Sequence, residues 1–294
     1  MSRREALVFT VLGLVGPVVM IAWTPDPATG LGTPTALLVA LGIYLIGWGA
    51  LITTIVVPAR GRVRPPRSAL GFLELLAAAF TFIAPDAVAL LAPVSPEVRL
   101  GVMLGARLLI AVGLLVYAEA IRRERDPSAD VAFRLRGALR DAGLGVGAVL
   151  AALPAVHGVS ALTQYVLIEW FGRSPEVQWI VKELRRPDLP EAQIVLLVLL
   201  AIVAAPVFEE VLFRGFLQGS LRRPLGRWGA IVVSALLFGA IHGTLDAILP
   251  LVVLGVVLAM IHDRARSLVA PIAGHAAFNA LMISAILIER GGGG

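Results

Sequence analysis

The fold is decided by one apolar run that keeps three charged side chains. Residues 194–214 read IVLLVLLAIVAAPVFEEVLFR, so an apolar stretch leads directly into Glu209, Glu210 and Arg214. A transmembrane helix needs about 20 mostly apolar residues to cross roughly 30 Å of hydrocarbon. Each charged group inside hydrocarbon costs at least ~2.5–3.5 kcal/mol on insertion scales. Because this membrane helix keeps three charged groups in spite of that cost, we predict that these side chains have a function.

The whole sequence has the composition of a membrane protein. Its 294 residues are 58% hydrophobic and 15% charged, with a mean hydropathy of +0.89. Soluble domains are about 45–50% apolar and about 25% charged. We predict an all-α, polytopic integral membrane protein with eight or nine transmembrane helices and a catalytic pocket among the C-terminal helices. The candidate segments are residues 6–23, 35–57, 69–92, 100–121, 142–168, 194–221, 229–244, 247–262 and 268–288.

The basic residues indicate the topology. All but one of the 25 are arginine, and 17 of the 25 lie on one side of the predicted helices. Short loops rich in arginine stay in the cytoplasm. We therefore expect a protein of the cell membrane with a cytoplasmic N-terminus. Residues 170–192 would lie outside, as a short amphipathic helix or as an ordinary polar loop.

The expected partners follow from the same pattern. Membrane lipids are expected partners, because the basic residues flank the predicted helices. No nucleic-acid or nucleotide partner is indicated, because the sequence has neither a basic stripe with interleaved aromatics nor a phosphate-binding loop. Cysteine is absent, which excludes disulfides, thiolate catalysis and cysteine-bound metals.

Polar groups divide the chain unevenly. Residues 1–121 are predicted to form an N-terminal four-helix membrane region, and residues 122–141 a charged cytoplasmic linker. Residues 142–290 form the second half, which holds every cluster of ionisable groups suited to chemistry, within a motif core at 194–288. The last four residues, 291–294, are glycine and are expected to be disordered.

Three predicted helices each present two side chains one turn apart on one face. The pairs are Glu210 with Arg214, Phe238 with His242, and His275 with Asn279. Glu210 and Arg214 can form an ion pair, which leaves Glu209 as the surplus carboxylate. Glu209 and His242 lie equally far along the chain from the turn expected near residue 225, so an antiparallel hairpin places them at one level. His275 lies nearer the end of its helix, and a tilt has to bring it to that level.

The order of these motifs identifies a family resemblance. Glu-Glu-x-x-x-Arg, then Phe-x-x-x-His, then His-x-x-x-Asn, on three membrane helices, resembles the CAAX-prenyl-protease and bacteriocin-processing (CPBP, Abi) family of intramembrane proteases, which includes the Rce1-type proteases. The resemblance covers residues 194–288, about a third of the chain. It implies an intramembrane endopeptidase that hydrolyses a peptide bond of a membrane-associated or C-terminal peptide or protein substrate.

The resemblance also implies roles for the motif residues. Glu209 would act with His242 to activate water, while His275 and Asn279 would stabilise the developing oxyanion. Positioning roles would fall to the other three motif residues, Glu210, Arg214 and Phe238. No cofactor or metal is expected. The alternative is a zinc-dependent intramembrane metalloprotease with Glu209, His242 and His275 as ligands.

Two other functions fit buried polar groups on membrane helices. One is a proton-coupled transporter, which the lack of internal repeats disfavours. The other is a non-catalytic scaffold that binds a membrane peptide, which the complete motif set disfavours. The arginine-dominated composition is typical of a GC-rich bacterium. A secreted peptide, a bacteriocin-like precursor or a membrane-protein tail therefore fits as substrate as well as a prenylated C-terminus does.

Overall fold

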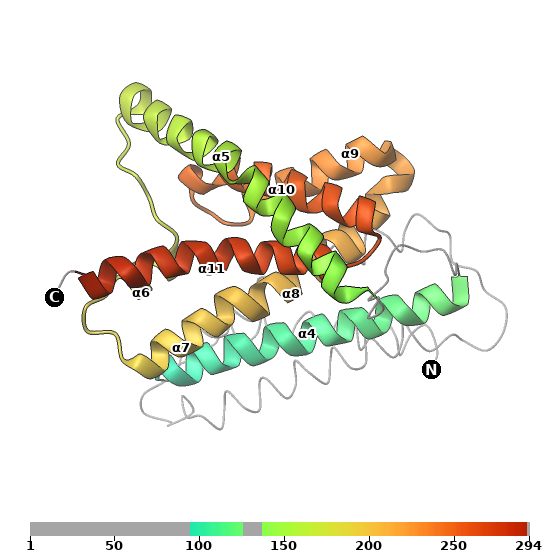
Figure 1. Cartoon of the computed structure of the whole chain (residues 1–294), viewed down its shortest axis with the longest axis horizontal. Helices are drawn as coiled ribbons and strands as arrows, with labels where there is room; N and C mark the ends of the chain where they lie inside the picture. The colour runs from blue at the N-terminus through green and yellow to red at the C-terminus, as the bar shows by residue number, and fades with distance from the viewer. Residues whose placement is uncertain (1–94, 126–136, 293–294) are drawn as a thin grey trace, which may run out of the picture. The chain divides into compact units, whose positions relative to one another are not determined.

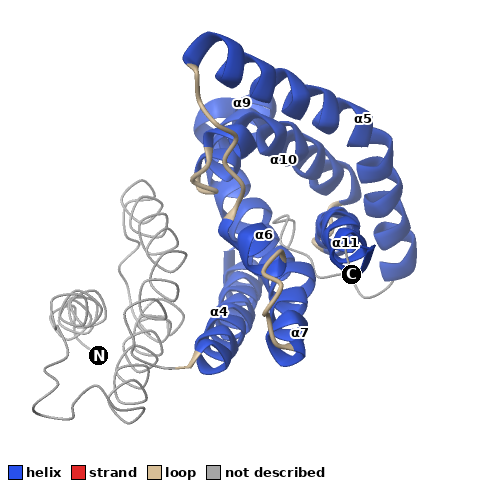
Figure 2. Ribbon diagram, turned by 90° about the vertical axis from the view of Figure 1, so that its left-hand side faces the viewer, coloured by secondary structure: helices blue, strands red, loops and turns tan. Residues whose placement is uncertain are grey.

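The computed structural model describes residues 95–125 and 137–292, and within these ranges every regular element is helical (Figure 2). The all-α prediction is therefore confirmed for the described part of the chain. The elements are α4 (Pro96–Arg125), α5 (Ala138–Phe171), α6 (Trp179–Leu184), α7 (Glu191–Leu199), η1 (Leu200–Ala204), α8 (Ala205–Glu210), η2 (Val211–Leu217), α9 (Gln218–Ala240), α10 (Leu245–Ala265) and α11 (Val269–Gly292). Elements η1 and η2 are π-helical.

Four helical stretches in the described ranges are long and apolar enough to cross a membrane. They are Ala138–Phe171, Glu191–Leu217, Leu245–Ala265 and Val269–Gly291. They match the segments predicted at 142–168, 194–221, 247–262 and 268–288. The segment predicted at 229–244 is a shorter apolar helix, Leu225–Ala240. The total of eight or nine crossings stays a prediction, because the segments predicted at 6–23, 35–57 and 69–92 lie outside the described residues.

The chain divides into two units, residues 1–124 and residues 125–294. Helix α4 overlaps the segment predicted at 100–121 and belongs to the first unit. Most of the predicted linker at 122–141 lies outside the described residues. Helix α11 extends to Gly292, two residues into the glycine tail that was expected to be disordered.

Helix α5 packs across α10 and α11, and α10 packs along α9 (Figure 1). Glycine permits the closest of these approaches. A Cβ at Gly145 of α5 would lie 1.8 Å from the carbonyl oxygen of Ala270, and a Cβ at Gly274 of α11 would lie 2.8 Å from the carbonyl oxygen of Gly145. Small residues let helix backbones approach in a membrane, where packing replaces the hydrophobic drive. Backbone therefore meets backbone between α5 and α11.

Two π-helical turns interrupt the helix that was predicted as one segment at 194–221. They flank α8, which ends on the two glutamates. Pro206 provides a cause for the first of them, because proline lacks an N–H and crowds the preceding turn. A π-turn inserts an extra residue, and such turns occur frequently at functional sites. The insertion rotates Glu209 and Glu210 relative to the preceding α7.

The segment predicted at 229–244 ends earlier than expected. Helix α9 ends at Ala240, and His242 lies in the turn that leads through Gly243, whose φ is 76°. A glycine in the left-handed region is a common way to end a helix without strain. His242 therefore lies just beyond a helix end and not inside a helix. The turn expected near residue 225 is a break in α9 at Gly226, with φ 68° and ψ −177°.

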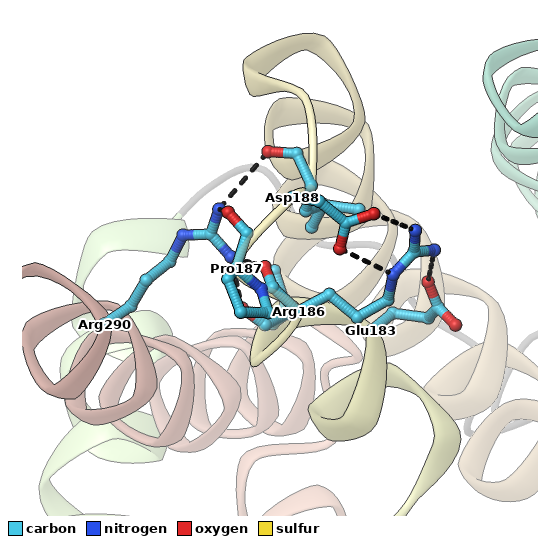
Figure 3. A network of polar contacts seen from close by, with 7 residues as sticks. Glu183, Arg186, Pro187, Asp188 and Arg290 are labelled. Carbon is cyan, nitrogen blue, oxygen red and sulfur yellow. Dashed lines mark hydrogen bonds and ion pairs between the residues drawn. The ribbon is translucent and has the colours of Figure 1, made fainter. Parts of the chain in front are cut away.

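The end of α11 binds the segment that joins α6 to α7 (Figure 3). Arg290 donates hydrogen bonds to four backbone carbonyls of this segment, those of Leu184, Arg186, Pro187 and Leu189. Beside it, Arg186 pairs with Glu183 at 3.0 Å and with Asp188 at 2.8 Å. We call Glu183, Arg186, Asp188 and Arg290 the surface cluster. It ties α11 to the start of the helix that carries the two glutamates.

Candidate active site

The predicted ion pair between Glu210 and Arg214 is present and fully buried. Arg214 Nη1 lies 2.8 Å from Glu210 Oε1, and neither side chain is exposed. Arg214 also donates from Nη2 to the backbone carbonyl of Gly255, at 3.0 Å. Its guanidinium lies 4.6 Å from the ring centroid of Phe238. A buried ion pair needs additional contacts for its remaining polar atoms, and these contacts engage both Nη atoms of Arg214. Among the described residues, Arg214 Nε donates no hydrogen bond and Glu210 Oε2 accepts none.

Phe238 packs between the arginine and both histidines. Its ring is fully buried and meets Phe213 and His275 edge to face, at centroid distances of 5.3 and 5.5 Å. The ring of His242 is tilted against it at 5.0 Å. Edge-to-face contacts are the preferred arrangement of aromatic pairs. Phe238 therefore sets the position of both imidazoles while its face receives Arg214.

His275 contacts both carboxylates from α11. Its Nδ1 lies 2.9 Å from Glu210 Oε1, and its Nε2 lies 3.9 Å from Glu209 Oε2. A carboxylate can only accept when ionised, so Nδ1 carries the hydrogen and donates it to Glu210. The imidazole is 4% exposed. The structure thus brings His275 to the level of the glutamates, as the expected tilt of its helix required.

His242 reaches the other glutamate from the turn after α9. Its Nε2 lies 3.8 Å from Glu209 Oε2, and its Nδ1 lies 2.7 Å from the Phe238 carbonyl oxygen. Because that carbonyl only accepts, Nδ1 carries the hydrogen, and Nε2 is the nitrogen that faces Glu209. A distance of 3.8 Å is too long for a direct hydrogen bond between Nε2 and the carboxylate.

Glu209 is therefore the point on which the two histidines converge. Its Oε2 atom is buried and accepts no hydrogen bond from the described residues. Two imidazole Nε2 atoms face this oxygen, one from the turn after α9 and one from α11. Because Glu210 pairs with Arg214, the carboxylate of Glu209 is left to face the two histidines, as the i,i+4 spacing indicated.

Asn279 lies one turn beyond His275 on α11, and its amide is engaged with backbone. Its Nδ2 donates to the carbonyl oxygen of Ala201 in η1, at 2.8 Å. The side chain is partly buried. This contact joins α11 to the first π-helical turn and not to Glu209.

Three contributors to the cluster were missed from the sequence. Two are backbone carbonyls, those of Ala201 and Gly255, which no side-chain motif can reveal. The third is Phe213, whose ring supports Phe238. Its position directly before Arg214 in the first motif was the available signal. A Cβ at Gly255 would lie 3.3 Å from the Phe238 ring, so the missing side chain keeps this carbonyl within reach of Arg214.

The zinc alternative requires Glu209, His242 and His275 to place their ligand atoms around one metal ion. Zinc bonds of about 2.0–2.2 Å in a tetrahedral site place ligand atoms roughly 3.3–3.5 Å apart. The distances from Glu209 Oε2 to the Nε2 atoms of His242 and His275 are 3.8 and 3.9 Å. Within residues 95–125 and 137–292, no group of three or more His, Asp or Glu side chains is arranged to hold a metal ion. As placed, these residues do not fit a tetrahedral zinc centre.

Comparison with known proteins points to the same region. Residues 191–281 match the family model described as type II CAAX prenyl endopeptidase Rce1-like. A curated protein of Bacillus subtilis (strain 168), named "Putative membrane peptidase YdiL", is 25% identical over 88 residues. That alignment covers 30% of this chain and 36% of the relative, so this chain spans about a third of the length of the relative. No solved structure matches.

All three motifs lie inside the matched segment, and four helices of the described ranges are able to cross a membrane. The protein is a membrane protein, and the resemblance indicated by its motifs is confirmed: residues 191–281 are similar to the Rce1-like family of CAAX prenyl endopeptidases.

Proposed function

We propose that this protein is an intramembrane endopeptidase acting on a membrane-associated or C-terminal peptide. The observation that carries the proposal is the convergence of two imidazole Nε2 atoms on the buried Oε2 of Glu209. The convergence lies within the segment similar to a peptidase family. A carboxylate beside two imidazoles is suited to general acid–base chemistry on water.

Glu209 and His242 are proposed to activate the attacking water. A water between Glu209 Oε2 and His242 Nε2 meets two acceptors, so both of its hydrogens are drawn away from its oxygen. As the water oxygen bonds to the substrate carbonyl carbon, Glu209 takes one proton and the carbonyl π electrons move to oxygen. Collapse of this tetrahedral intermediate breaks the C–N bond, and the proton held by Glu209 passes to the leaving amine.

His275 and Asn279 are the proposed donors to the oxyanion. Because the Nδ1–H of His275 is bonded to Glu210, this ring would donate from Nε2 as an imidazolium. Asn279 has two amide hydrogens, of which one bonds to Ala201 and the other remains for substrate. Donors aimed at developing charge in a water-poor site supply a large share of the rate in such reactions.

The buried ion pair would position these groups. Glu210 holds Arg214 and His275 through the same oxygen atom, Oε1. Arg214 in turn contacts the Phe238 ring, which packs against both histidines. Any shift of the pair would therefore change the distances to Glu209.

The direct test is cleavage of a peptide library by the full chain reconstituted in lipid. Glu209→Gln keeps size and hydrogen bonding but cannot accept a proton, so cleavage should fall to background while the melting temperature is kept. Glu183→Gln, which removes an exposed carboxylate of the surface cluster, is the matched control and should cleave like the wild type. Equal cleavage by both variants would refute the proposal.

Zinc hydrolysis remains the alternative to be separated by experiment. Elemental analysis of active protein, together with cleavage after exhaustive chelation, distinguishes the two. We expect cleavage to survive chelation. Stoichiometric zinc, with activity lost on chelation and restored by zinc, would instead make Glu209, His242 and His275 metal ligands.

We further propose that the protein lies in the cell membrane with the N-terminus and the 222–227 loop in the cytoplasm. Arg222 and Arg227 both pair with Asp263 at the end of α10, at 2.8 and 2.6 Å, which keeps these arginines at one end of the helices. The chain has no cysteine, so Gln178→Cys would be the single labelling site. We expect a reagent added outside intact cells to label that thiol. Labelling from the cytoplasmic side alone would show that the topology is the opposite of the proposed one.

A further inference from the structure

At the first π-helical turn, the carbonyl of Ala201 has no backbone donor in either helical register. The N–H of Ala205 bonds to the carbonyl of Leu200, five residues earlier. In that register the next carbonyl, that of Ala201, would accept from residue 206, which is a proline without an N–H. In the α-helical register its donor would be the N–H of Ala205, which is already bonded to Leu200.

The Asn279 side chain supplies the missing donor. Its Nδ2 lies 2.8 Å from the Ala201 carbonyl oxygen, and Ala201 is 7% exposed. In hydrocarbon no water can satisfy an open carbonyl, so breaks at proline persist only where a neighbouring helix or side chain provides the hydrogen bond. We propose that Asn279 has a positioning role in addition to its proposed contact with the oxyanion: one of its amide hydrogens completes the π-turn opened by Pro206 and fixes α11 to the helix that carries the glutamates.

The consequence is a two-point attachment across the proline. Asn279 holds Ala201 before Pro206, and His275, one turn earlier on α11, holds Glu210 after it. A helix broken at proline can bend or rotate at the break. The two α11 contacts limit that movement, and with it the placement of Glu209 against the two imidazoles. The role of this attachment in catalysis rests on the proposed peptidase function, whereas the attachment itself does not.

A double-mutant cycle between Asn279 and Pro206 tests the attachment by stability alone. Asn279→Ala should lower the melting temperature of the full chain in detergent by about 5 °C, because a buried carbonyl is left open. Pro206→Ala adds an N–H that can bond to Ala201 in the π-helical register, and it also allows the α-helical register, in which the N–H of Ala205 bonds to Ala201. In the Pro206→Ala background, Asn279→Ala should lower the melting temperature by less than half as much as it does in the wild type. Equal losses in both backgrounds would overturn the proposal.

Gln218 provides the matched control. Its Nε2 also donates to a buried backbone carbonyl, that of Ala259, at 3.2 Å. No proline opens that carbonyl, so the loss caused by Gln218→Ala should be the same in the wild-type background and in the Pro206→Ala background. If Pro206→Ala fails to fold, Asn279→Asp decides. Only a protonated carboxyl can donate to the Ala201 carbonyl, so the melting temperature of Asn279→Asp should fall as the pH rises, relative to the wild type. No such pH dependence would contradict the proposed bond.

Cleavage measured below all melting temperatures separates positioning from stability. If Asn279 positions Glu209, Asn279→Ala should lower kcat/KM about 10²–10³-fold, and adding Pro206→Ala should regain at least about tenfold. No regain would refute the positioning role in catalysis. Absence of any cleavage by the wild type would count against the proposed function, while the melting cycle would still report on the attachment.

Discussion

Arginine–carboxylate ion pairs occur both in the buried cluster around Arg214 and in the surface cluster. The two regions differ in how much water reaches the paired side chains. Around Arg214 both partners are fully buried, and the guanidinium meets a carboxylate, a backbone carbonyl and an aromatic face. In the surface cluster the side chains of Arg186 and Asp188 are 45% and 72% exposed. Water can replace a lost partner in the second setting but not in the first. The number of ion pairs is therefore a poor guide to their importance, and burial decides it.

The largest effect is expected from removing the buried cation. Arg214→Ala leaves Glu210 as an uncompensated charge, and loss of one partner of a buried pair typically costs ~3–5 kcal/mol. Adding Glu210→Gln should restore part of the folded yield. Thermal unfolding in detergent measures both variants, with Arg186→Ala in the surface cluster as the control. If Arg214→Ala unfolds no more readily than Arg186→Ala, burial does not separate the two regions.

An intermediate effect is expected from Arg290, which belongs to the surface cluster but binds backbone. Its guanidinium donates to four carbonyls between Leu184 and Leu189, but two of these hydrogen bonds are exposed and two are only partly buried, so water can replace part of what the substitution removes. Arg290→Ala should lower the melting temperature more than the exposed substitutions do. Arg290→Lys should lower it less than Arg290→Ala does, because a lysine ammonium keeps the charge but lacks the planar, forked donors of a guanidinium.

Arg185 is the matched control for Arg290, because it pairs with the adjacent Glu289 at 3.1 Å and both side chains are exposed. Its replacement by alanine should change the melting temperature little. A larger loss from Arg185→Ala than from Arg290→Ala would show that charge, and not backbone binding, holds this segment.

The smallest effect is expected at the exposed pair of Arg186 and Asp188. The hydrogen bond from Arg186 holds the pKa of Asp188 below its ordinary value of 3.8. A depressed carboxyl pKa stabilises the fold above the ordinary value and loses that contribution as the pH falls through the folded-state value. Asp188→Asn should therefore alter the melting temperature slightly at pH 7 and not at all in strong acid. A large difference at pH 7 would contradict the comparison.

Side-chain spacing predicted much of the buried cluster. The i,i+4 spacing of Glu210 and Arg214 gave the ion pair, and equal distance from one turn gave the encounter of Glu209 with His242. Both rules depend only on helix geometry and antiparallel pairing, which are local or nearly so. The family resemblance over residues 191–281 follows from the same residues.

Backbone partners could not be predicted in this way. Arg290 and Asn279 bond to carbonyls 78 to 106 residues away in the chain, and every residue offers a carbonyl. Pro206 signals a break in the segment predicted at 194–221, but the donor that satisfies the open carbonyl comes from another helix and could not be predicted from this segment. The end of α9 at Ala240 was missed because apolar periodicity continues through Ile241, while Gly243 sets the turn.

The central claim is that Glu209 and His242 act together on one water, and a double-mutant cycle in the cleavage rate tests it most directly. Glu209→Gln should bring kcat to background in folded protein and His242→Ala should be nearly as severe. The double variant should be little slower than either, because the effects of groups that act as a unit are not additive. The reconstituted full chain, with Glu183→Gln as control, provides the measurement. Losses that multiply in the double variant, or a Glu209→Gln variant that cleaves like the control, would contradict the account.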